Sequence, residues 1–187
     1  MNVRICVANS SHIIHTHKIC ELMYVSAQQR GTGIAARAPE YIADKMQKGK
    51  AVIALDGVKV VGFSYIETWS HALFVANSGL IVAHEYRNHG LARQIKHTIF
   101  SLSRQLYPNA KIFSITTGLA VMKLNTELGY RPVPFSELTS DPVFWDGCKE
   151  CRNYDILERN NRTLCLCTGM LFDPSALSIK HPIVQSP

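Results

Sequence analysis

Residues 78–92, SGLIVAHEYRNHGLA, constrain the fold more than any other stretch of this chain. A short apolar run suited to a strand ends at Val82, and an apolar pattern with helical spacing follows, beginning with Ile95 and Ile99. Between the two lies a tight turn that contains Gly90. Such a turn at a helix N-terminus leaves backbone N–H groups without partners. Together with the positive end of the helix dipole, they favour binding of a pyrophosphate.

This turn resembles the acyl-CoA signature of the GNAT superfamily of N-acetyltransferases. That signature is an Arg or Gln, two residues, a Gly, one residue, and a Gly or Ala, and Arg87, Gly90 and Ala92 occupy its three positions. A P-loop is excluded because no Gly-Lys-Ser/Thr follows, and a Rossmann fingerprint would need a turn richer in glycine. Residues 119–130, LAVMKLNTELGY, also resemble the last helix of the GNAT family, which closes with Leu-Gly-aromatic.

The resemblance implies an α/β (α+β) GNAT fold. Its central sheet is mixed, mostly antiparallel, splayed at the acyl-CoA site and flanked by helices. We expect the order strand, two helices, three strands, helix, strand, helix, strand between Val3 and Phe135, with Ser10 or Ser11 capping the first helix and a hairpin turn at Asp56-Gly57. We expect a GNAT acyl-CoA-binding and catalytic domain over residues 1–140. A Cys-rich C-terminal extension over 141–187 would complete the sheet.

Composition narrows the functional classes. The chain has 187 residues, 47% of them apolar, as in an ordinary globular domain. The N-terminus lacks a signal-peptide pattern and no apolar run is long enough to span a membrane, so we expect a cytoplasmic protein with no membrane partner. The net charge of +6 is scattered, without a basic helix or aromatic-basic patch, which disfavours nucleic acid and suits an anionic partner such as CoA. Whether the protein forms a homodimer stays open.

By resemblance, the acyl donor is acetyl-CoA or succinyl-CoA. Its thioester would lie between two splayed parallel strands at residues 80–82 and 112–116. Backbone groups of Ile81 and Val82 would pair with the pantetheine arm. The pyrophosphate would be held by the turn residues Arg87, Asn88, His89, Gly90, Leu91 and Ala92. A substrate amine would attack the carbonyl directly, which requires a base, a polarised carbonyl and help for the departing thiolate.

Three residues are candidates for the catalytic steps. Many GNAT proteins place a Tyr four residues before the Gly of the last helix, as the acid that protonates the thiolate, and this chain has Asn125 there. An amide can hydrogen-bond the sulfur or the pantetheine but cannot supply a proton at neutral pH, so the acid is absent, Tyr130 or water. For the base we consider Glu67 first, near a strand end with apolar neighbours that would strengthen a carboxylate as a base. His71 and His84 are runners-up.

The loop at residues 30–37, RGTGIAAR, borders the acceptor pocket in the GNAT fold. Arg30 and Arg37 would suit bidentate recognition of a carboxylate, which indicates a small acidic acceptor such as an amino acid. The alternative is a flexible basic loop. The whole chain also resembles the GNAT proteins found with arginine-biosynthesis enzymes in Bacteroidetes, which implies glutamate as the acceptor.

Two close cysteine pairs follow the GNAT-like region. Cys148 and Cys151 have knuckle spacing, and a strand at residues 163–172 would put the sulfurs of Cys165 and Cys167 on one face. Four thiolates could hold a structural zinc, although a zinc ribbon usually has two residues between the members of its second pair. Reduced, metal-free thiols or disulfides are the alternatives.

Three functions are compatible with these features. The first is an acyl-CoA-dependent N-acyltransferase. The second is a CoA-binding regulatory or sensor module without turnover, which the Asn125 position favours. The third, a nucleic-acid binder built on the cysteine knuckles, lacks an accompanying basic or aromatic face.

Overall fold

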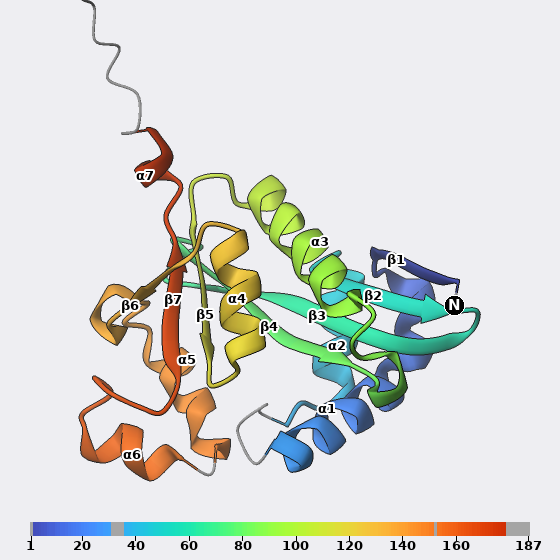
Figure 1. Cartoon of the computed structure of the whole chain (residues 1–187), viewed down its shortest axis with the longest axis horizontal. Helices are drawn as coiled ribbons and strands as arrows, with labels where there is room; N and C mark the ends of the chain where they lie inside the picture. Colours follow the sequence, from blue (N-terminus) through green and yellow to red (C-terminus); the bar gives the residue numbers. More distant parts are fainter. Residues whose placement is uncertain (1, 31–35, 152, 179–187) are drawn as a thin grey trace, which may run out of the picture.

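A computed structural model describes residues 2–30, 36–151 and 153–178. The strands form one sheet in the order β1-β2-β3-β4-β5-β7-β6 (Figure 1). Among these described strands, β4 and β5 are the only neighbours that run parallel. The strands are β1 (Val3–Val7), β2 (Ala51–Asp56), β3 (Lys59–Trp69), β4 (Phe74–Val82), β5 (Lys111–Thr116), β6 (Arg131–Val133) and β7 (Thr168–Phe172).

Helices cover both faces of the sheet, with α3 and α4 on one side and α1 and α2 on the other (Figure 1). The α-helices are α1 (Thr16–Arg30), α2 (Pro39–Gln47), α3 (Leu91–Leu106), α4 (Leu119–Glu127), α5 (Pro142–Asp146), α6 (Tyr154–Arg159) and α7 (Ser175–Ser178). Short 3-10 turns are η1 (Ser10–His15), η2 (His84–Tyr86), η3 (Phe135–Glu137) and η4 (Gly147–Glu150). No helix within the described ranges is long and apolar enough to cross a membrane.

The strand β2 shows why both faces are covered. Five of its residues, AVIAL, are buried in succession. Because neighbouring side chains of a strand point to opposite faces, Val52 and Ala54 pack into the core beneath α3, whereas Ala51, Ile53 and Leu55 pack against α1 and α2. A continuous apolar strand thus requires a helical layer on each side.

A β-bulge in β4 opens the sheet. Between the pairs Phe63↔Ile81 and Tyr65↔Ser78, β4 carries one residue more than β3. Gly79 lies in this bulge with φ +63°, a conformation that favours glycine. On its other edge, β4 pairs with β5 only over 74–76 and 111–113. Beyond Ala76 the two strands diverge, so the splay expected at the acyl-CoA site is present.

The segment after residue 141 contributes to the central sheet. The strand β7 lies between β5 and β6 and is antiparallel to both. Its residue Leu171 packs with Trp145 of α5, Leu157 of α6 and Phe113 of β5 in a third cluster of buried side chains. Sheet and C-terminal segment therefore share one core.

Three local expectations were wrong. The first helical turn is capped by Asn9, whose side chain accepts from the Ser11 N–H, and not by Ser10 or Ser11. The hairpin turn is Gly57-Val58, because Asp56 still pairs with Lys59. The last strand begins at Thr168 and not at residue 163, so Cys165 and Cys167 precede it.

Candidate active site

The turn before α3 has the backbone geometry of an anion site. Gly90 caps α3 with φ +76°, and Asn88 is also left-handed, with φ +65°. A Cβ added to Gly90 would meet no atom within 4 Å, so the space above the helix start is open. The first N–H groups of α3 and the positive end of its dipole thus face solvent-accessible space.

A cavity of about 410 Å³ lies against this turn. Its walls come from the end of β4, the turn with the first residues of α3, and α4 along its length. They include Ile81, Val82, Arg87, Asn88, Gly90, Leu91 and Ala92. Of the expected cofactor residues at the turn, His89 is exposed and stands outside this wall.

Arg87 connects the turn to the end of β4 and to α1 through hydrogen bonds. Its Nε donates to the carbonyl oxygen of Val82 at 3.2 Å, and its other nitrogens contact Gln29 and Ser26 of α1 at 3.3 and 3.5 Å. The guanidinium therefore links the strand end, the turn and α1. It still lines the cavity, where its charge favours an anion.

A second cavity, of about 860 Å³, passes through the splay. It shares Leu80, Ala120 and Val121 with the first cavity, so the two are adjacent along the β4–α4 side. From the splay it extends to α2 on one side and to α5 and α6 on the other. A long, thin ligand could therefore run from the turn before α3 into the gap between the strands.

Glu67 lies in the wall of this larger cavity, only 6% exposed. Tyr41 of α2 donates a hydrogen bond to its Oε1, and Ser78 of β4 donates one to its Oε2 at 2.6 Å. Arg37 Nη2 lies 3.8 Å from Oε1. Three polar side chains thus contact the carboxylate, in a wall that also contains the apolar Trp69 and Ala76.

Tyrosines around Glu67 stay protonated. Burial, with the Glu67 carboxylate adding to it, raises the pKa of both Tyr41 and Tyr65. Tyr65 in turn accepts a hydrogen bond from Arg37 Nε at 3.0 Å. Burial alone would lower the pKa of Arg37, but Tyr65 and Glu67 outweigh it and keep that pKa raised. At neutral pH this cluster therefore holds one fixed cation and two phenolic O–H groups.

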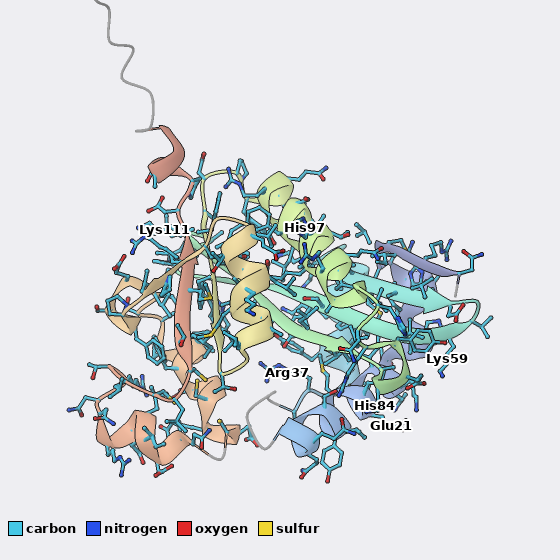
Figure 2. The ribbon with its side chains drawn as sticks, in the orientation of Figure 1. Glu21, Arg37, Lys59, His84, His97 and Lys111 are labelled. Atoms are coloured by element: carbon cyan, nitrogen blue, oxygen red, sulfur yellow. The ribbon has the colours of Figure 1, made fainter. Side chains whose placement is uncertain are left out.

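Arg37 is the only one of the two expected acceptor arginines whose side chain falls within the described structure. Figure 2 shows it below α4, between α1 and the α5–α6 segment. It lines the large cavity and its guanidinium packs over the Tyr41 ring at 5.4 Å. Arg30 ends α1, but its side chain and residues 31–35 lie outside the described part.

Asn125, expected to hydrogen-bond the sulfur or the pantetheine, and Tyr130, considered as the acid, both lie behind the cavity wall. Asn125 is fully buried, and its Nδ2 contacts Met170 Sδ at 3.5 Å. Tyr130 is also buried, and its hydroxyl donates to Asn77 Oδ1 at 3.1 Å. Burial raises the pKa of Tyr130. The structure thus links Tyr130 to the cavity through Asn77, whereas Asn125 faces the core.

Neither runner-up for the base lies in the cavity. His71 is in the turn between β3 and β4 with φ +54°, and His84 starts η2. Both are exposed, and neither belongs to the described wall of the large cavity. Glu67 is therefore the candidate base that the fold places at the splay.

All four C-terminal cysteines line the large cavity. Burial, followed by the neighbouring thiols, raises the pKa of Cys148 to about 11 and of Cys167 to about 12, which favours protonated thiols. Within the described ranges no group of three or more Cys, His, Asp or Glu side chains is placed to hold a metal. A structural zinc at Cys148, Cys151, Cys165 and Cys167 therefore lacks support here. It stays a prediction that metal analysis of the purified protein can test.

Tyr41, Tyr65, Ser78 and Lys96 line the same cavity but were not recognised in the sequence as candidates. Tyr65 and Glu67 share a strand face at a spacing of two residues, a signal that could have been noticed. Ser78 is also readable, since it directly precedes the glycine of the bulge. Tyr41 and Lys96 follow helical spacing like core residues, so no local signal distinguishes them.

Comparison with known proteins gives structural matches only. No family model matches the chain, and no curated protein does. A phosphinothricin acetyltransferase of the GNAT superfamily from Sinorhizobium meliloti, solved with acetyl-CoA, matches with a TM-score of 0.60 and 14% identity over 92% of this chain and 89% of its own. This chain has the GNAT fold.

Two further matches cover about nine-tenths of this chain. N-acetylglutamate synthase from Neisseria gonorrhoeae, solved with CoA and N-acetylglutamate, gives a TM-score of 0.64 at 17% identity over 92% of this chain. This chain spans only 35% of that protein. A protein from Mycobacterium tuberculosis, solved in complex with CoA, gives 0.61 at 16% identity over 91% of this chain and 98% of its own.

Proposed function

We propose that this protein is an N-acyltransferase that moves an acyl group from acyl-CoA to the amine of a small acidic acceptor. The observation that carries the proposal is the pair of adjacent cavities. One lies against the turn before α3, and the other passes through the splayed strands to Glu67. Three structurally similar proteins were solved with CoA or acetyl-CoA bound, which supports an acyl-CoA donor.

The acceptor is inferred from the charges at the far end of the large cavity. Arg37 and Glu67 both line it and form an ion pair at 3.8 Å. A free amino acid carries an ammonium and a carboxylate a few ångströms apart, so it complements this pair. Glutamate in arginine biosynthesis is our leading choice, and the N-acetylglutamate bound by the gonococcal synthase supports it.

The reaction follows from these positions. Glu67 takes a proton from the acceptor ammonium, and the free amine attacks the thioester carbonyl in the gap between β4 and β5. The N–C bond forms and the C–S bond breaks. The nitrogen gives up its second proton to solvent as the amide forms, and CoA leaves as a thiolate that takes up a proton from solvent. Thiolates are adequate leaving groups, so Asn125 at the usual Tyr position is compatible with turnover.

Thiol release from acetyl-CoA and succinyl-CoA against a panel of free amino acids tests the proposal. We expect turnover with one acidic amino acid, and an Arg37→Lys variant with a raised KM for that acceptor and unchanged affinity for CoA. A bidentate site does not tolerate lysine well. Tight CoA binding without release for any acceptor would reject the enzyme and favour a CoA-binding sensor.

A further inference from the structure

Lys96 is a buried cation that the proposed reaction does not use. It lies on α3, inside the core, and is only 1% exposed. Its Nζ lies 5.1 Å from the centre of the Tyr130 ring. Nowhere in the described part of the chain does a carboxylate or a hydrogen-bond acceptor pair with it. An unpaired buried ammonium is costly, so its presence calls for a compensating anion.

The position of Lys96 indicates where such an anion would come from. Lys96 lines the large cavity at the splay, together with Asn77 of β4 and Ser114 of β5. Phe113, directly before Ser114, forms the last β4–β5 pair with Ala76, directly before Asn77. Lys96, Asn77 and Ser114 therefore gather at the base of the gap, where the two strands separate.

Two of these three polar residues have capacity to bind a ligand. Asn77 is occupied, because it accepts from Tyr130 and donates to Ser103 at 2.8 Å. The Ser114 hydroxyl is 8% exposed as part of its residue and forms no side-chain hydrogen bond to any other described residue. An ammonium and a hydroxyl from different elements, both buried and both lining one cavity, are groups that suit a carboxylate.

We propose that the acyl group of the donor ends in a carboxylate, as in the mono-CoA thioester of a short dicarboxylic acid, and that Lys96 with Ser114 binds this carboxylate at the base of the splay. The inference rests on the proposed function, because it places the thioester in the gap above this site. Asn77 holds the base of the gap in place through its bonds to Tyr130 and Ser103.

The titration of Lys96 agrees with an anion-binding role. Desolvation lowers its pKa from 10.5 to about 7, so an empty site holds a mixture of ammonium and amine. A carboxylate beside the nitrogen would favour the ammonium form of Lys96. Where Lys96 was a neutral amine before binding, the carboxylate would therefore bind together with the uptake of one proton. The elements around the Lys96 nitrogen are α3, β4, β5 and the segment of Tyr130. Among the described residues that they contribute to the cavity wall, none besides Lys96 is charged.

The carboxylate is a handle and takes no part in bond making. The acceptor nitrogen bonds to the thioester carbon, the C–S bond breaks, and CoA leaves with the electron pair of that bond. One proton of the acceptor ammonium passes to Glu67, the nitrogen loses a second to solvent as the amide forms, and the CoA thiolate takes up a proton from solvent. The product is an amide that keeps the distal carboxylate, which then leaves the Lys96 site with it.

Donor preference in wild type and Lys96→Met tests the inference, with Lys123→Met as the matched control. Lys123 is exposed and lines the cavity by the turn, so its loss should weaken all CoA thioesters equally. We expect wild type to prefer succinyl-CoA to acetyl-CoA in kcat/KM. In Lys96→Met, kcat/KM for succinyl-CoA should fall by about 30-fold or more, as for a buried charge pair that loses one partner. The value of kcat/KM for acetyl-CoA should stay unchanged in this variant.

Other outcomes separate the two proposals. Turnover with acetyl-CoA, and a donor ratio that Lys96→Met leaves unchanged, would overturn the carboxylate site and keep the acyltransferase. An equal loss with both donors would also overturn it. If no donor turns over, calorimetry tests the site by itself. Tighter binding of succinyl-CoA than of CoA in wild type, but not in Lys96→Met, would support the carboxylate site even though the acyltransferase proposal had failed.

Discussion

At the scale of single residues, Glu67 and Lys96 are two buried charges in the wall of one cavity, and the fold treats them differently. Arg37, Tyr41 and Ser78 surround the carboxylate of Glu67. Lys96 has the face of Tyr130 as its neighbour. Because Lys96 has no counter-ion among the described residues and burial lowers its pKa to about 7, its charge is sensitive to pH and to a bound anion.

We expect Glu67→Gln to lower kcat by about 10²- to 10⁴-fold, the usual contribution of a positioned general base. The amide keeps a similar shape but cannot take the acceptor proton. Steady-state kinetics with the acceptor, together with CoA affinity from calorimetry, measure the effect. Glu85→Gln is the control, because Glu85 is exposed and pairs with Lys59 at 2.6 Å, away from the cavity. Equal kcat values for the two variants would remove Glu67 from the mechanism.

Lys96 predicts an unusual dependence of stability on pH. Its folded-state pKa is about 7 and its ordinary value is 10.5, so between these pH values the unfolded chain binds the extra proton. Stability should therefore rise with pH across this window, at most by about 1.4 kcal/mol per pH unit. Urea unfolding should show that Lys96→Met stabilises the protein most at or below pH 7, with the gain shrinking toward pH 10. A gain independent of pH would contradict a buried ammonium.

At the scale of elements, two glycines with positive φ, Gly79 and Gly90, have different structural roles. Gly79 forms the bulge that turns β4 away from β5, and Gly90 starts α3 at the anion turn. A Cβ on Gly79 would lie 2.4 Å from Tyr65 Cε1 and 2.7 Å from Met23 Cε, whereas on Gly90 it would meet nothing within 4 Å. The backbone requirement is shared, but the packing requirement is specific to the bulge.

We expect Gly90→Ala to cost about 1–2 kcal/mol of unfolding free energy, the price of a left-handed alanine. Gly79→Ala carries the same backbone cost and adds about 1–3 kcal/mol of overpacking against Tyr65 and Met23. Chemical denaturation of both variants measures the difference. Gly57→Ala, with φ +59° and open space around it, is a second control for the backbone cost. Equal losses at all three sites would show that the bulge accommodates a side chain.

At the scale of the whole molecule, the C-terminal segment and the GNAT-like region share a core. The strand β7 separates β5 from β6, and the segment that leads to it lines the large cavity on the side away from α2. If the expected boundary at residue 140 separated two folding units, the protein would unfold in two transitions. A shared core predicts one cooperative transition.

Two leucines of this segment provide the test. Leu171 is 1% exposed and packs in the cluster around Phe113, whereas Leu166 is 61% exposed. We expect Leu171→Ala to destabilise the whole protein by about 2–5 kcal/mol and Leu166→Ala to change stability little. Denaturation followed by circular dichroism and by tryptophan fluorescence should shift together for Leu171→Ala. Separate transitions would indicate that the C-terminal segment folds as its own unit.

Local sequence signals determined the strand–turn–helix at residues 78–92 and the helix that begins at residue 119, and the resemblance of both stretches to GNAT signatures implied the fold. Each depends on residues close in the chain: apolar period, a glycine that tolerates positive φ, and a helix start. Glu67 was also identifiable, as a carboxylate near the end of a long apolar strand.

Only the tertiary structure decided what surrounds these residues. The partners of Glu67 come from α2, β4 and the segment before α2, and the lysine at the base of the splay comes from α3. In the sequence Lys96 is one more cation on an amphipathic helix. Whether such a side chain reaches water or a buried cavity depends on how α3 rotates against the sheet, which long-range packing sets. The packing of α4 likewise depends on residues distant in the sequence. Asn125 was expected beside the thioester, but its side chain is fully buried.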